Sequence, residues 1–516
     1  MHIEPLLNAL GGARGRYQLL QFTLQVLGNF VNSFSTFSVV FIGYQPEYQC
    51  GEIHDLSLLE SYFPGNMSDG TLAFIYQQCS VDVSLTRDGN VTSRSVPCLA
   101  GINFSMPSDT SFLTEWDLVC DKAGLTELSQ TLIIVGQAVS GFIFATLCDR
   151  YGRKWVYVIS ASGLLVISIA TAFSPDYRFL LVCRVITGAF KQGVGVSYYT
   201  LFMELIPMKS RGTASVIDAA LFSLGSSFLP LFAYAMQGYS WRYLQLVVAG
   251  LSLYSLLMLC VLDESILWLL NNDRVAEVER ILIKACRMNG KNINDVMLVL
   301  REDVLKSATS DVDKRVPTHG TEDTEVDNGD GMEERPEIVA GDSVIEGKVD
   351  KAYSTQYNVL DLFRYKEVVI PLFVTSFIWT SNNLYYYGIM LGSADLSGNR
   401  FFNFALLSLV EIPSSIIAYF LLPRINRRTL SLWCQTVASG ALLLSVVLVE
   451  TGGSDISLVL ANIFTYIGKF TLNGGYCVLF VFALEVFPTT LRSAGLGFAA
   501  TVSRLSSMGA PFFSLL

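Results

Sequence analysis

Charged residues are scarce in this chain, and this scarcity is the first indication of its class. Only 16% of the 516 residues are charged, whereas soluble globular proteins carry roughly a quarter. Hydrophobic residues make up 51% of the chain, and the mean hydropathy is +0.45. These values indicate a membrane protein rather than a soluble one.

The residues on which most enzymes depend are also rare. The three histidines, His2, His54 and His319, all lie outside the long apolar runs, and no cysteine or histidine spacing is typical of a zinc site. No nucleophile stands in a pattern with a base. We therefore expect no enzyme activity, no metal site and no cofactor, and leave open only a coupling ion such as Na+ or H+. The net charge of −10 argues against a nucleic-acid partner.

Long apolar runs dominate the chain instead. A helix that crosses a bilayer needs about 20 apolar residues. Eleven segments have about this length: 19–43, 125–147, 155–173, 178–203, 214–237, 241–262, 367–391, 401–422, 430–450, 456–484 and 493–516. We interpret the first, which follows Arg14 and Arg16, as a retained helix rather than a cleaved signal peptide. The prediction is an all-α, multi-pass membrane protein.

Basic residues in the short loops predict the orientation. The loops at 149–154, 207–212, 423–428 and 486–492 hold nine Lys or Arg residues, whereas the alternate short loops hold only Arg400. Because Lys and Arg collect on the cytoplasmic side, we place the N-terminus in the cytoplasm and segment 44–124 outside.

Segment 44–124 has the composition of an extracellular loop. Its four cysteines predict disulfide bonds, with three pairings open, and its three Asn-x-Ser/Thr sequences predict glycosylation. The cysteines are Cys50, Cys79, Cys98 and Cys120, and the acceptor residues are Asn66, Asn90 and Asn103.

A long polar segment divides the helices into two groups. We predict an N-terminal bundle at 1–262, a cytoplasmic linker at 263–366 and a C-terminal bundle at 367–516. Within the linker, 274–306 shows helical periodicity, and 307–350 is acidic and poor in aromatics, which is typical of a disordered tether. Six spans precede the linker and five follow it, so we expect that a twelfth helix is missing from the chain.

Charged turns recur at matching places in the two groups, which indicates an internal repeat. The turn Asp149–Lys154 follows the second span, and Pro423–Arg428 follows the eighth. Arginines in such turns can pair with acids on neighbouring helices and so latch one conformation. The alternative is that they only anchor the topology. The predicted gating residues are Asp149, Arg150, Arg153, Glu204, Arg211, Arg424, Arg427, Glu485 and Arg492.

These motifs resemble those of the major facilitator superfamily and, within it, the organic cation/anion/carnitine transporter family. The resemblance covers nearly the whole chain. It rests on Thr114–Cys120 at the end of the outer loop, Asp149–Lys154, Asp263–Leu270 after the sixth span, and Glu485–Thr489 with Arg492. The family has Pro and Arg where this chain has Asp263 and Leu267. The resemblance implies a fold of two pseudo-symmetric six-helix bundles.

The carnitine-transporting members of that family are the most similar. Their segments resemble Leu229–Tyr234, Val410–Pro413, Gly468–Phe470 and Ser503–Leu505, and Asn32 has a counterpart there. This implies uptake of a small organic zwitterion or cation across the plasma membrane. The partners are then a small organic solute and the lipid bilayer, with the oligomeric state open.

Charges inside the spans are candidate binding residues, because each costs at least about 2.5 kcal/mol at the bilayer centre. Arg504 stands where the resemblance implies an Arg in anion and carnitine transporters, and its guanidinium suits a carboxylate. Glu411 can balance a substrate cation, couple to an ion or pair with Arg504. Lys469 is a further candidate, and we expect Lys191 to pair with Asp218.

Aromatic residues of the seventh span are candidates for holding a quaternary ammonium group, which has no N–H to donate and binds ring faces. They are Trp379, Tyr385 and Tyr386, although packing in the core or against lipid is an alternative for each. The leading function is alternating-access transport of carnitine-like compounds. Organic anion exchange and a non-transporting receptor or scaffold are the alternatives.

Overall fold

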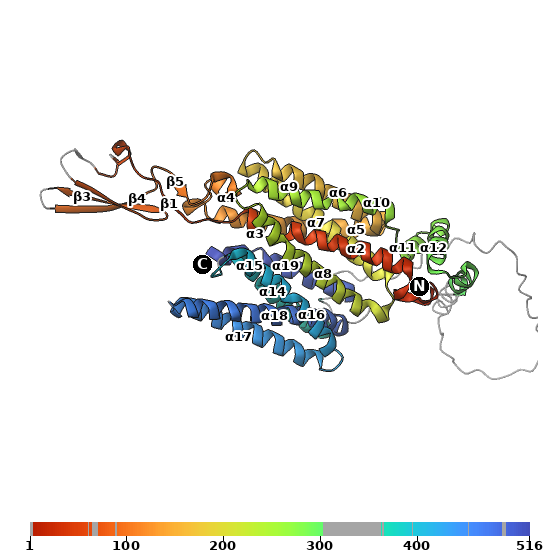
Figure 1. Cartoon of the computed structure of the whole chain (residues 1–516). Helices are drawn as coiled ribbons and strands as arrows, with labels where there is room; N and C mark the ends of the chain where they lie inside the picture. Colours follow the sequence, from red (N-terminus) through yellow and green to blue (C-terminus); the bar gives the residue numbers. More distant parts are fainter. Residues whose placement is uncertain are drawn as a thin grey trace, which may run out of the picture.

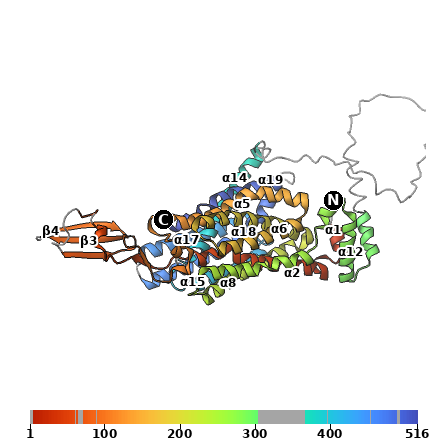
Figure 2. The same cartoon turned by 90° about the horizontal axis from the view of Figure 1, so that it is seen from above.

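The computed structural model describes residues 4–59, 61–63, 71–87, 90–302, 363, 366–394, 396–452, 454–487 and 492–515. Long helices lie side by side, with strands beyond one end and short helices beyond the other (Figure 1). The view from above shows the same order, with the N-terminus and α12 opposite the strands (Figure 2). The acidic tether predicted at 307–350 and the acceptor Asn66 lie outside the described residues.

Every predicted span coincides with helical structure. The N-terminal bundle consists of α2 (Arg16–Phe37), α3 (Val39–Ile42), α5 (Gly124–Tyr151), α6 (Arg153–Ala172), α7 (Tyr177–Leu205), α8 (Met208–Ala235), α9 (Trp241–Ser252) and α10 (Tyr254–Val261). The C-terminal bundle consists of α14 (Lys366–Leu391), α15 (Arg400–Leu409), α16 (Glu411–Leu421), α17 (Arg427–Gly452), α18 (Asp455–Val486) and α19 (Arg492–Ser507), followed by the 3-10 helix η8 (Ala510–Leu515).

Local sequence explains where several of these helices begin. The Asp176 carboxylate accepts a hydrogen bond of 2.7 Å from the backbone N–H of Phe179 at the start of α7. Ser454 and Ser457 form a capping box at the start of α18. Such side chains satisfy N–H groups that have no partner within the helix.

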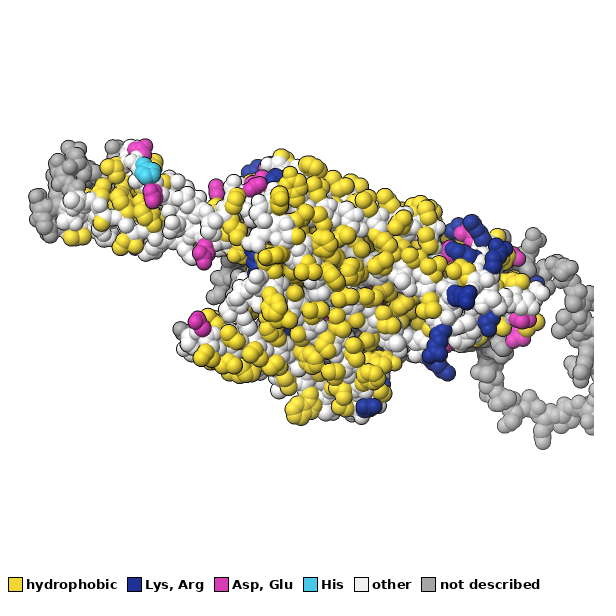
Figure 3. All heavy atoms as spheres, viewed as in Figure 1, with side chains coloured by type: hydrophobic (Ala, Val, Ile, Leu, Met, Phe, Trp, Pro, Cys, Tyr) yellow, Lys and Arg dark blue, Asp and Glu magenta, His cyan; other side chains and the backbone are white. Residues whose placement is uncertain are grey.

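An apolar belt surrounds the bundle. Figure 3 shows hydrophobic side chains over the long helices, with Lys and Arg gathered near the end that carries the N-terminus. Large apolar residues such as Val139, Val166 and Leu443 are each more than 60% exposed. Within the described residues, nine helical segments are long and apolar enough to cross a membrane. Such a surface fits lipid rather than water.

The described part of segment 44–124 folds into two small sheets, which its sequence did not indicate. Strands β1 (Tyr48–Cys50) and β5 (Ile102–Phe104) pair antiparallel, as do β2 (Thr71–Tyr76), β3 (Ser80–Arg87) and β4 (Asn90–Pro97). A short helix, α4 (Phe112–Glu115), leads back to the bundle. The four cysteines pair as predicted, in the connectivity Cys50–Cys98 and Cys79–Cys120.

Short helices form a cluster at the opposite end. They are α1 (Glu4–Ala9), α11 (Ile266–Asn271) and α12 (Val275–Asn289), with further helix at 293–302. Leu6, Trp268, Val278 and Leu282 are among the buried residues that hold them together. The helical periodicity predicted from 274 onward is confirmed for the described residues.

Candidate functional site

An ion pair between Glu411 and Lys469 lies inside the C-terminal bundle. The Lys469 Nζ and Glu411 Oε1 atoms are 2.9 Å apart, and the two residues are 0% and 4% exposed. The Ser223 hydroxyl of α8 donates to Glu411 Oε2 at 2.6 Å. Glu411 therefore connects the two bundles and neutralises one buried lysine.

A break between two helices places Glu411 at this point. The eighth span consists of α15 and α16, and Glu411 is the first residue of α16. Pro413 has no N–H, so it cannot continue the hydrogen-bond ladder of α15. The Asn473 amide donates to the Glu411 carbonyl oxygen at 3.0 Å, which fixes the broken segment against α18.

The three aromatic candidates of α14 do not come together. Tyr386 lies in the site, with Lys469 Nζ 3.3 Å from its ring centroid. Trp379 is 5% exposed and packs with Leu479 and Ala499 in the core, whereas Tyr385 is 38% exposed. Because α14 is a regular helix, its successive residues point in different directions. Of the three candidates, Tyr386 alone lies beside the ion pair.

Arg504 and Lys191 lie half-buried without an acidic partner among the described residues. Arg504 Nη1 would be 3.9 Å from a Cβ placed at Gly141 of α5, so this arginine of α19 faces the other bundle. Lys191 Nζ donates to the Thr36 hydroxyl at 2.9 Å.

The expected Lys191–Asp218 ion pair, and the Glu411–Arg504 pair that was one of three possibilities for Glu411, are replaced by other contacts. Lys469, and not Arg504, is the partner of Glu411. Asp218, expected beside Lys191, instead accepts hydrogen bonds from Tyr198 and, at 2.9 Å, from Asn29. Asn32 lies elsewhere, on a cavity that it shares with Tyr157 inside the N-terminal bundle.

The charged turn after α5 is tied to neighbouring elements of its own bundle. Arg153 Nη2 lies 3.3 Å from both Asp149 Oδ1 and Glu204 Oε1. Gly152 has a φ of 99°, and a Cβ there would collide with the Glu264 carboxylate. Only glycine fits both demands.

Glu264 holds this turn from the other side. It accepts hydrogen bonds from the backbone N–H groups of Arg153 at 2.9 Å and Lys154 at 3.1 Å. Burial raises the pKa of the Glu264 carboxyl above its ordinary value, although these donors and the N–H of Ser265 act in the opposite direction.

The other predicted gating residues have simpler surroundings. Arg150 and Arg424 are exposed, Arg427 is half-buried, and Arg211 Nε donates to the Ile206 carbonyl at 3.1 Å. The side chains of Glu485 and Arg492 lie outside the described residues. On this side, contact between the bundles includes the hydroxyl groups of Thr213 and Tyr419, which are 2.9 Å apart.

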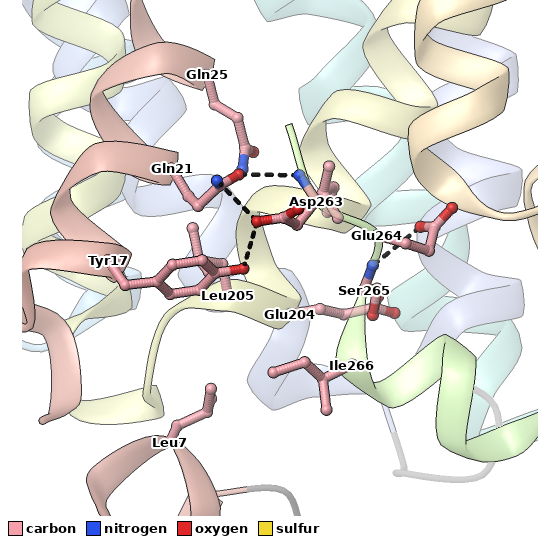
Figure 4. Close-up of a pocket in the computed structure, with 11 residues that line it drawn as sticks. Leu7, Tyr17, Gln21, Gln25, Glu204, Leu205, Asp263, Glu264, Ser265 and Ile266 are labelled. Atoms are coloured by element: carbon pink, nitrogen blue, oxygen red, sulfur yellow. Dashed lines mark hydrogen bonds between the residues drawn. The ribbon is translucent and has the colours of Figure 1, made fainter. Parts of the chain in front are cut away.

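Asp263 joins three elements near the turn. Figure 4 shows Tyr17, Gln21 and Asp263 pointing toward one another in a small pocket. The Asp263 carboxylate accepts from Tyr17 at 3.1 Å, from Gln21 at 3.3 Å and from Lys284 at 2.5 Å. Asp263 thus connects the first span to the short helices. The family that the motifs resemble has a proline at this position.

Aromatic rings close the opposite end between the bundles. Phe41 of α3 stacks on Phe401 of α15 with ring centroids 5.6 Å apart, and its ring also lies 5.2 Å from Phe404. Arg400 Cζ lies 3.4 Å from the ring centroid of Tyr44. The end that carries the strands is therefore closed by stacked rings and by the cation–π contacts of Arg400.

Sequence reasoning missed several of these residues. Ser223 gives no signal, because a serine in an apolar helix most often bonds to its own backbone. Two other residues could have been found from the sequence. Glu264 stands in the motif after the sixth span, and Arg400 is the one Lys or Arg in the alternate short loops.

Comparison with known proteins agrees with this architecture. The family model described as Major Facilitator Superfamily matches residues 122–511. The chain is similar to the "Organic cation transporter protein" of Drosophila melanogaster, with 28% identity over 98% of this chain and 85% of that protein. It is 26% identical to "Organic cation/carnitine transporter 2" of Homo sapiens, over 99% of this chain and 86% of that one.

A solved structure shares the fold. The xylose transporter XylE from E. coli, in a partially occluded inward-open conformation, superposes with a TM-score of 0.55 at 12% identity, over 96% of this chain and 93% of that one. The resemblance derived from the motifs is confirmed, and the family consists of transporters rather than enzymes. The chain belongs to the Major Facilitator Superfamily.

Proposed function

We propose that this protein is a plasma-membrane transporter of small organic solutes that carry a carboxylate, with carnitine-like zwitterions as the leading class. Its N-terminus would lie in the cytoplasm, and the two bundles would rock about the site between them. The likeness to an organic cation/carnitine transporter supports the solute class.

One observation carries the carboxylate requirement. Glu411 already neutralises Lys469, whereas Arg504 and Lys191 have no acid beside them among the described residues. Unbalanced cations at membrane depth are costly, and a bound carboxylate would relieve that cost. The guanidinium of Arg504 offers it two parallel hydrogen bonds.

The candidate site for the ammonium group of a zwitterion is already partly occupied. The ring of Tyr386 would attract it, but Lys469 already occupies one face of that ring. A substrate cation would therefore compete with Lys469 or displace it toward Glu411. This favours organic anion transport as the second candidate, because an anion would need no such displacement.

A panel uptake assay separates these candidates. Cells or vesicles that contain the full chain would be offered labelled carnitine, ergothioneine, tetraethylammonium and p-aminohippurate, with and without sodium. We expect saturable uptake of carnitine or ergothioneine that Arg504→Ala abolishes at unchanged surface expression. Uptake of p-aminohippurate alone would establish the anion candidate, and no saturable uptake would favour a receptor or scaffold. A dependence on sodium would identify the coupling ion.

A further inference from the structure

A small cavity lies at the strand-bearing end, where the two bundles meet. Its volume is about 30 Å³, room for roughly two water-sized groups. Thr110 of the outer segment and Gln237, Ser240 and Trp241 of the N-terminal bundle line one side. Arg400 and Phe401, at the start of α15, line the other. The cavity is therefore complete only while the bundles touch at this end.

Two hydrogen-bond donors of this cavity are unused. Arg400 Nη1 and Thr110 Oγ1 are buried, and neither has a hydrogen-bond partner among the described residues. Leaving a buried polar group unpaired costs about 1–3 kcal/mol, and more when it is charged. A ligand that accepts from both groups would remove this cost.

The surroundings of Arg400 determine how a ligand can approach it. Its Cζ atom lies 3.4 Å from the ring centroid of Tyr44 and 4.7 Å from that of Phe401. The rings cover part of the guanidinium, and its Nη1 atom remains to donate to a carboxylate or a spherical anion.

The charge of the cavity selects an anion. Among the described residues that line it, Arg400 is the only charged one. The nearby Glu115 accepts from Trp241 Nε1 at 2.7 Å and forms an ion pair with Arg242, so its charge is already balanced. The N-terminus of α15 adds a partial positive charge.

We propose that this cavity is an extracellular binding site for a small monovalent anion, a chloride ion or a carboxylate, that bridges the two bundles and stabilises the outward-closed conformation. A ligand that binds only one conformation shifts the population toward it. Bound anion would thus slow the opening of the outer end. Only this last consequence rests on the proposed transport function.

Thermal unfolding of the full chain in lipid nanodiscs tests the binding directly. Sodium chloride and sodium acetate would each be compared with the sodium salt of HEPES, a bulky sulfonate, at equal ionic strength. We expect one or both small anions to raise the unfolding midpoint by about 2 °C at tenfold excess over Kd. The anion that raises the midpoint shows whether the site binds chloride, a carboxylate or both.

Substitutions then locate the effect. Arg400→Gln and Thr110→Val should remove or weaken the anion-dependent rise, whereas Arg504→Ala should keep it and so exclude the central site. Arg178→Gln is the matched control, because Arg178 is an exposed arginine at the same end and outside the cavity. An equal rise in Arg400→Gln and Arg178→Gln would overturn the proposal, as would no rise with either anion in the unaltered chain. Thr110→Val retains Arg400 and keeps the test valid if Arg400→Gln does not fold.

A transport measurement tests whether bound anion slows the opening of this end. Replacement of external chloride or acetate by HEPES should raise the initial uptake rate of the unaltered chain and leave that of Arg400→Gln unchanged. If no solute is taken up while the unfolding shift still depends on Arg400, the transport function fails and the anion site stands.

Discussion

The two bundles hold their central lysines in different ways. Lys469 of the C-terminal bundle is fully buried and forms an ion pair with Glu411, whereas Lys191 of the N-terminal bundle is half-buried and bonds to the neutral hydroxyl of Thr36. A buried ion pair is largely complete in itself. An unbalanced lysine needs a counter-charge from elsewhere. We therefore propose a structural role for Lys469 and anion recognition for Lys191 and Arg504.

Removal of Glu411 should produce the largest effect. Glu411→Ala leaves Lys469 buried without its counter-charge, and such a change costs about 3–5 kcal/mol. We expect a strongly lowered thermal unfolding midpoint and a low yield of folded protein. Glu411→Ala combined with Lys469→Met should recover much of the loss, because no uncompensated charge then remains. Glu52→Ala, at an exposed outer position, serves as the control. Equal midpoints for the single variant and the control would contradict the pairing.

Gly152→Ala sharpens the comparison between the charged turns of the two bundles. The first turn needs a positive φ and space for Glu264, while the second has Asn426 in its turn. We expect a loss of about 1–3 kcal/mol from backbone strain. The free energy or midpoint of unfolding measures it, with Gly250→Ala as control, since a Cβ at Gly250 meets no atom within 4 Å. A loss no larger than that of the control would show that the turn tolerates a side chain.

Lys191→Met separates the two lysines directly. Because Lys191 has no acidic partner among the described residues, its loss should leave the unfolding midpoint unchanged or slightly raised. Uptake of a carboxylate substrate should fall about tenfold or more, a change of roughly 1.4 kcal/mol. Lys469→Met, the matched variant, should lower the midpoint instead. A lowered midpoint in Lys191→Met with reduced uptake only in Lys469→Met would contradict this assignment and make Lys191 the structural residue.

Glu264→Gln should give the smallest effect, visible as a change in pH dependence. The pKa of Glu264 is raised by burial, so the folded protein holds its proton more tightly than the unfolded chain. Its contribution to stability is present below the unfolded pKa of about 4.3 and is lost as the pH rises through the folded value. The unfolding midpoint of Glu264→Gln should therefore depend less on pH in this window. Asp149→Asn, at an exposed acid of the same turn, should retain the dependence.

The membrane helices could be predicted because a single physical demand decides them. A span must be apolar over a fixed length, and the starts of α6 at Arg153, α8 at Met208 and α17 at Arg427 follow from the polar loops at those positions. The strands of the outer segment were missed. Disulfides and a small core around Val81 and Val83 support this segment, and neither can be located from the spacing of cysteines.

The central site was predicted in part. Glu411, Lys469 and Arg504 stood out because charge inside a span is costly. Their pairing could not be predicted, since it depends on how α16 and α18 pack after the break at Val410. Tyr386 was separated from Trp379 and Tyr385 only when the rotation of α14 was known.

The most direct test of the central claim is a matched pair of substrates that differ only in the carboxylate. Initial uptake of labelled carnitine and of its uncharged-end analogue, carnitine amide, would be compared in the unaltered chain and in Arg504→Ala. We expect at least tenfold faster uptake of carnitine than of carnitine amide in the unaltered chain and loss of that preference in the variant. Equal uptake of both compounds by the unaltered chain would contradict it.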